Sequence, residues 1–191
     1  LMNAITPEQN RRTKKMMLWF AMISISMTFA GLTSAYVVSS ARADWLTDFV
    51  MPQSFIWSTV VLVLSSLVFH NTKAAVRQGN TTRAVTLAGA TVVMAVVFIV
   101  GQFMGFNSII ASGYYFTGAQ SSITTSFIYV LVLLHMAHLF AGIIVLLVVF
   151  YKLLKNKYTP ANYLGLELAV LFWHFLDILW LYLFFFVLLY N

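Results

Sequence analysis

The chain has 191 residues, of which 61% are hydrophobic and only 8% are charged. A soluble domain carries about a quarter charged residues, so this composition excludes an ordinary soluble protein and indicates an integral membrane protein. The absence of cysteine excludes disulfides, iron–sulfur clusters and cysteine-ligated zinc. The formal net charge of +6 does not indicate a nucleic-acid partner, because the basic residues lie in short segments between apolar runs.

Five apolar stretches are long enough to cross about 30 Å of hydrocarbon as helices rising about 1.5 Å per residue. In chain order they are residues 16–38, 55–69, 84–106, 123–150 and 163–190. The first run is too long for the core of a secretory signal, so we expect it to stay in the mature protein. The second is the shortest, and Pro52 suits its first turn. We expect residues 1–191 to form a single membrane domain.

The connections between these stretches alternate in charge. Ten of the eleven basic residues lie before the first stretch, between the second and third, or between the fourth and fifth. Only Arg42 falls on the other side, close to Asp44. The positive-inside rule makes the basic side cytoplasmic. The sequence therefore predicts a cytoplasmic N-terminus and a C-terminus on the outer side.

Titratable side chains lie within the last two stretches, where hydrocarbon makes them costly unless they have a partner, a cavity or a function. His135 and His138 are three apart, so they share one helix face. Glu167, His174 and Asp177 form one stripe on the next helix. A short basic loop joins the two helices, so we expect them to pack antiparallel, with the histidine face against the carboxylate stripe.

Several roles for this polar cluster stay open at this point. The simplest is a clasp, in which His–Asp hydrogen bonds hold the last two helices in register. A haem between the helices would use His135 or His138 together with His174. A zinc or di-iron site would need more carboxylates than Glu167 and Asp177 supply. A proton relay is physically reasonable, as is a cavity for a lipid headgroup or a substrate.

Small residues predict close helix packing elsewhere. Gly101 and Gly105 are four apart in the third stretch, which is the small-xxx-small pattern of membrane helices. Serine, threonine, glycine and alanine punctuate the first stretch between Ser24 and Ala35 in a similar way.

The segment Trp173-His174-Phe175-Leu176-Asp177-Ile178-Leu179-Trp180 resembles a signature in the last helix of cytochrome c oxidase subunit III. His135-x-x-His138, followed by Gly142, resembles the His-Gly-Leu-His segment of that family's preceding helix. Glu167 falls where many members carry a glutamate, and Leu64-Ser65-Ser66 extends the resemblance to the second stretch. The resemblance singles out a polar cluster and two motif aromatics: His135, His138, Glu167, His174, Asp177, Trp173 and Trp180.

The resemblance implies an all-α integral membrane protein of five transmembrane helices, arranged as two helical bundles that flank a lipid-filled cleft. It implies the short bacterial form of the family, in the cell (inner) membrane with a periplasmic or extracellular C-terminus. The chain would carry no catalytic centre and bind no cofactor of its own, since haem and copper belong to the partner subunits.

The implied function is that of a non-redox subunit III in a bacterial haem–copper terminal oxidase, which reduces oxygen and translocates protons. The chain would stabilise subunit I of a cytochrome c or quinol oxidase. It would also bind phospholipid in the cleft, which offers oxygen a hydrophobic route. The implied partners are subunit I, other oxidase subunits, membrane phospholipids and a respiratory supercomplex.

Some positions depart from the family pattern. Ser24 and Ile25 stand in the first stretch where members often carry an acidic residue. Glutamates often found around the segment that is Gln102–Gly105 here are absent, and Met136 replaces a glycine. Any proton role of those family carboxylates is therefore not carried over to this chain.

Two other functions stay open from the residues. An independent proton-coupled transporter would favour inverted repeats or broken helices, and five unequal stretches without a helix-breaking proline argue against it. A haem-bearing, quinone-linked membrane anchor predicts a Soret absorption band in the isolated chain.

Overall fold

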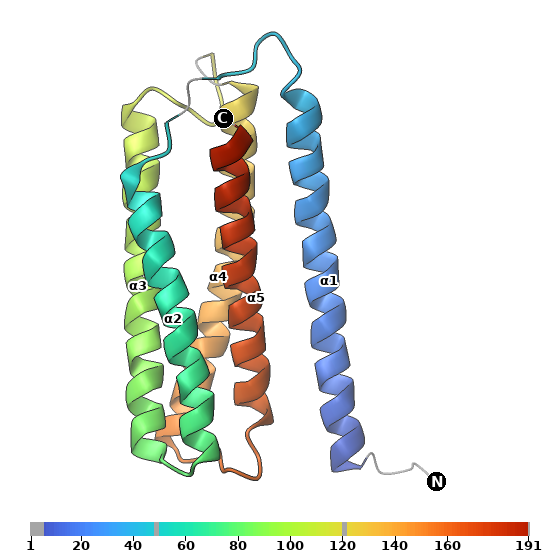
Figure 1. The fold of residues 1–191 in the computed structure, drawn as a ribbon, viewed down its shortest axis with the longest axis vertical. Helices are drawn as coiled ribbons and strands as arrows, with labels where there is room; N and C mark the ends of the chain where they lie inside the picture. Colours follow the sequence, from blue (N-terminus) through green and yellow to red (C-terminus); the bar gives the residue numbers. More distant parts are fainter. Residues whose placement is uncertain (1–5, 48–49, 120–121, 191) are drawn as a thin grey trace.

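The computed structural model describes residues 6–47, 50–119 and 122–190. These residues form five α-helices that run up and down (Figure 1). The helices are α1 (Pro7–Ser39), α2 (Gln53–Arg77), α3 (Thr81–Ala111), α4 (Ile123–Leu154) and α5 (Leu164–Tyr190). Each is long and apolar enough to cross a membrane. The predicted all-α membrane protein with five spanning helices is therefore confirmed.

The helices extend beyond the apolar stretches that predicted them. The basic segment before residue 16 belongs to α1, and α2 continues to Arg77. Hydropathy detects only the hydrocarbon-spanning part, whereas capping decides where a helix begins. The Thr6 hydroxyl accepts a hydrogen bond from the Gln9 backbone N–H, and the Gln9 side chain accepts one from Thr6, so a capping box starts α1. Pro52 precedes α2 as its N-cap and does not lie in its first turn.

Four of the helices form one bundle, and α1 stands beside it (Figure 1). Within the bundle, α2 packs against α3 and α5, and α4 packs against the same two helices. Among the described residues α1 contacts only α4 and α5. Its buried side chains form a single stripe, which consists of Met22, Phe29, Thr33 and Tyr36. The rest of α1 presents apolar side chains outward, as a helix facing lipid or another subunit does.

The C-terminal end of α1 is held against the bundle by aromatic packing and a hydrogen bond. Near its C-terminal end, the Tyr36 ring packs edge-on against Trp45, Phe127 and Phe186, with ring centroids 4.7, 5.9 and 5.1 Å away. The Thr33 and Tyr182 hydroxyls share a 2.9 Å hydrogen bond between α1 and α5.

Glycines set the closest approach within the bundle. A Cβ added at Gly101 would lie 2.9 Å from the Ser58 Cβ of α2, and one added at Gly105 would lie 2.6 Å from the Phe55 ring. Both distances are shorter than real Cβ contacts allow. The predicted close packing at the small-xxx-small pattern is confirmed, and the helix it contacts is α2.

Gly101→Ala should lower the thermal unfolding midpoint of the purified protein, because the new methyl group meets Ser58 and must separate α2 from α3. Overpacking of this kind costs about 1–3 kcal/mol. Gly31→Ala is the matched control, since a Cβ at Gly31 of α1 meets nothing within 4 Å. Equal midpoints for the two variants, measured by differential scanning fluorimetry, would contradict the close α2–α3 contact.

Candidate functional site

The segment of α5 from Trp173 to Trp180, which carries the signature, is hydrogen-bonded to α2. The Trp173 indole N–H donates to the Ser65 hydroxyl at 3.1 Å, and the Trp180 N–H donates to the Thr59 hydroxyl at 2.8 Å. The two indoles are seven residues apart on α5, and their acceptors are six apart on the antiparallel α2. This spacing places the two bonds two helical turns apart along one interface. We call these two bonds the indole–hydroxyl ladder.

Aromatic packing surrounds the ladder in the bundle core. Phe69 meets Trp173 edge-on at 6.3 Å between ring centroids, and Phe98 of α3 meets Trp180 in the same way at 5.6 Å. Both tryptophans are buried. A buried indole N–H needs an acceptor, and the α2 hydroxyls supply it.

A second polar chain crosses the same interface. The His174 Nδ1 is hydrogen-bonded to the Ser66 hydroxyl, and the His174 Nε2 lies 3.4 Å from Nδ1 of His70, which is exposed on α2. The Ser66 hydroxyl also lies near the Asp177 carboxyl, although neither carboxyl oxygen makes a hydrogen bond within the described part of the chain. His174 and Asp177 thus face α2.

The histidines of α4 behave differently from each other. His135 is fully buried, and its ring tilts against Trp180 with centroids 5.0 Å apart, but neither ring nitrogen has a hydrogen-bond partner within residues 6–47, 50–119 and 122–190. His138 Nδ1 bonds to the Leu134 carbonyl oxygen of its own helix at 2.7 Å. The His138 ring lies edge-on to Phe29 of α1.

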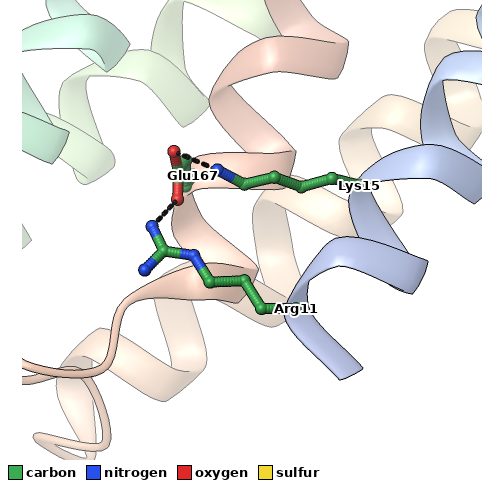
Figure 2. A network of polar contacts seen from close by, with 3 residues as sticks. All are labelled: Arg11, Lys15 and Glu167. Carbon is green, nitrogen blue, oxygen red and sulfur yellow. Dashed lines mark hydrogen bonds and ion pairs between the residues drawn. The ribbon is translucent and has the colours of Figure 1, made fainter. Parts of the chain in front are cut away.

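Glu167 lies at the start of α5 and bridges to α1 (Figure 2). Its two carboxylate oxygens pair with Arg11 at 3.0 Å and Lys15 at 2.9 Å. The first turn of a helix also favours a carboxylate through the helix dipole. Glu167 therefore ties the N-terminal end of α1 to the bundle.

The predicted clasp between the histidines of α4 and the carboxylates of α5 is wrong in its partners. No hydrogen bond joins His135 or His138 to Glu167 or Asp177 among the described residues. The reason is that the α5 stripe faces α1 at its beginning and α2 further along. Spacing on one helix fixed which residues share a face, but not which neighbour that face meets.

Sequence reasoning missed most of the partners. They are Arg11 and Lys15 on α1, and Thr59, Ser65, Ser66 and His70 on α2. One signal was available: Thr59 and Ser65 are six residues apart, close to the seven residues that separate Trp173 from Trp180. Intervals of about two helical turns on two antiparallel helices allow both pairs of side chains to meet.

Gly142 of α4 lets α5 approach. A Cβ there would lie 2.7 Å from Leu176 Cδ1 and 3.6 Å from the Trp173 ring. The glycine that follows the histidine pair therefore makes room for the signature helix.

A basic pocket of about 810 Å³ lies where the start of α1 meets the α4–α5 connection. Its cationic side chains come from both sides and are Arg11, Lys14, Lys152 and Lys157. Tyr158 also lines the pocket, and burial raises the pKa of its phenol. This arrangement suits an anionic group at the edge of an apolar bundle.

Clusters of metal ligands do not occur in the part of the chain that the structure describes. No group of three or more histidine, cysteine, aspartate or glutamate side chains converges there. Trp173, His174 and Trp180 of α5 instead bond to α2, so fold and site define a multi-pass helical membrane protein with a polar α2–α5 interface.

Comparison with known proteins identifies the family. The family model of cytochrome c oxidase subunit III matches residues 20–191, and the chain belongs to this family. It is thus a subunit III of a haem–copper oxidase and a multi-pass membrane component of an oxidase complex.

Relatives come from two kinds of oxidase. The chain is 27% identical to cytochrome c oxidase subunit 3 of Synechocystis sp., over 85% of this chain and 70% of the relative. It is 28% identical to the protein of the same name from Thermostichus vulcanus, over 85% of this chain and 80% of the relative. It is 27% identical to cytochrome bo(3) ubiquinol oxidase subunit 3 of Buchnera aphidicola, over 97% of this chain and 91% of the relative.

Thr59→Val should destabilise the protein, because it keeps the side-chain shape but leaves the buried Trp180 N–H without an acceptor. Interhelical hydrogen bonds in membranes contribute about 0.6 kcal/mol on average and up to about 1.7 kcal/mol. Thr28→Val is the control, since in the described part of the chain that exposed hydroxyl bonds only to the Ser24 carbonyl of its own helix. A thermal midpoint that falls no further for Thr59→Val than for Thr28→Val would argue against the ladder.

Glu167→Gln should loosen the start of α1. Partly exposed ion pairs contribute about 0.5–1 kcal/mol, so trypsin cleavage near Arg11 and Lys15 should speed up about two- to fivefold. Glu8→Gln is the control, because within the described residues Glu8 pairs only with Arg12 one turn along α1. Equal cleavage rates, followed by mass spectrometry, would show that Glu167 does not hold α1.

Proposed function

We propose that the chain is a non-redox subunit III of a bacterial terminal oxidase, which stabilises the catalytic subunit I and binds phospholipid. The observation that carries this proposal is the indole–hydroxyl ladder. Trp173 and Trp180, the aromatic ends of the α5 signature, bond to Ser65 and Thr59 inside the bundle. A signature used to hold two helices together supports a structural role better than a redox role.

The outer faces of the bundle support docking on a larger membrane partner. Trp19, Phe20, Ile23 and Met27 are exposed along α1. Exposed apolar side chains over the length of a spanning helix meet either lipid chains or another subunit. We infer that subunit I and lipid share these faces in the assembled oxidase.

The basic pocket supports phospholipid binding between α1 and the four-helix bundle. We infer that α1 and this bundle are the two units that flank the family's cleft. Arg11 and Lys14 come from α1, whereas Lys152 comes from the last turn of α4 and Lys157 from the α4–α5 connection. A lipid phosphate there would neutralise cations from both units, and its acyl chains would follow their apolar faces. Anionic lipids concentrate at the cytoplasmic leaflet, which agrees with the proposed cytoplasmic N-terminus.

Affinity purification of the tagged chain in mild detergent tests the main proposal. Subunits that carry haem and copper should co-purify, and the chain separated from them should have no Soret band. A lone polypeptide that drives ion flux in liposomes would favour a transporter. A lone polypeptide with its own Soret band would favour a haem-bearing anchor. Either result would contradict the proposal.

The lipid is tested by removing the cations that line the pocket. Arg11→Gln combined with Lys14→Gln should lower the phospholipid retained per oxidase, measured by native mass spectrometry, because a phosphate loses two charged hydrogen-bond donors. Arg77→Gln combined with Lys155→Gln is the control, since neither residue lines the pocket. Equal lipid retention in both double variants would contradict headgroup binding here.

A further inference from the structure

Two titratable groups deep in the bundle lack hydrogen-bond partners among the described residues. They are the His135 ring, with both nitrogens unpaired, and the Asp177 carboxyl, with both oxygens unpaired. His135 is fully buried, and Asp177 is only 4% exposed. A neutral imidazole always has one donor and one acceptor, and a carboxyl group has two acceptor oxygens. Buried polar atoms of this kind are satisfied in folded proteins by protein groups or by ordered water.

The two groups lie around the same tryptophan. The His135 ring on α4 packs against Trp180 with centroids 5.0 Å apart. Trp180 follows Asp177 by three residues, so the carboxyl lies about one turn away on the same face of α5. The His135 imidazole therefore lies level with Trp180, about one helical turn along α5 from the Asp177 carboxyl.

Protein groups nearby are already engaged elsewhere. The Trp180 N–H donates to Thr59, and the Ser66 hydroxyl beside Asp177 bonds to His174. Neither satisfies His135. Gln102 of α3 donates its amide to Ser58, and its carbonyl oxygen is itself unpaired in the described structure. The interior thus holds more polar atoms than it holds protein partners for them.

We propose that water bound in the core of the four-helix bundle bridges the His135 imidazole to the Asp177 carboxyl. One water molecule has two donors and two acceptor sites. It can donate to a carboxyl oxygen and accept from the imidazole N–H, and a further water can serve the other ring nitrogen. The link joins α4 to α5 through solvent at the depth where a direct His–Asp bond was expected from the sequence.

Cryo-electron microscopy of the assembled oxidase, at a resolution that shows ordered water, tests the proposal directly. We expect solvent density within hydrogen-bond distance of a His135 nitrogen and an Asp177 oxygen. A direct His135–Asp177 bond would overturn the proposal. So would satisfaction of both groups by other side chains, or a core without solvent density at this position.

A double-mutant cycle tests the coupling without a structure. His135→Leu and Asp177→Leu should each lower the thermal midpoint of the oxidase by several degrees, because each leaves the other group and its water incompletely bonded. The double variant should lose less than both shifts together. His138→Leu is the control and should combine additively with Asp177→Leu, since His138 bonds within its own helix. If the midpoint shifts of His135→Leu and Asp177→Leu simply add in the double variant, the proposal is overturned. If a variant fails to assemble, the cryo-electron microscopy map of the unaltered oxidase decides the proposal.

Discussion

The bonds from α5 to the hydroxyl groups of α2 are the interaction on which the rest of the structure depends. In a bilayer, apolar side chains gain nothing by leaving lipid for another helix, so packing and polar bonds decide which helices associate. Trp173 and Trp180 fix the relative height and rotation of α5 and α2 because each indole has a single donor that must meet its own acceptor. Once α2 and α5 are fixed, α3 joins at the glycine contacts of α2, and α4 joins where Gly142 admits α5.

The attachment of α1 follows a different logic. Helix α1 takes no part in the indole–hydroxyl ladder, and it contacts only α4 and α5 among the described residues. It is held by the Glu167 ion pairs at one end and by the Tyr36 aromatic cluster at the other. The basic pocket lies at the N-terminal end of α1, where the cations gather. The same ion pairs that place α1 therefore help to shape the proposed lipid site.

Much of the fold was predictable, whereas the partners of the polar residues were not. Hydropathy located five helices because a spanning helix must be apolar over about 20 residues. Helical periodicity placed Glu167, His174 and Asp177 on one stripe of α5, whereas Glu167 pairs with α1 and His174 bonds to α2. It gave no means of choosing between α4 and α2 as the partner, and the short loop favoured α4. Arg11 and Lys15 were read only as topology signals, because nothing in their spacing shows that α1 leans on the start of α5.

The central claim is that the α5 signature holds this subunit together and carries no redox chemistry. The most direct measurement is the visible spectrum of the purified oxidase, taken together with the amount of this subunit retained, for the double variant Ser65→Ala and Thr59→Val. The account predicts that subunit retention falls while the haem spectrum per oxidase stays unchanged. An altered haem spectrum with the subunit fully retained would contradict it.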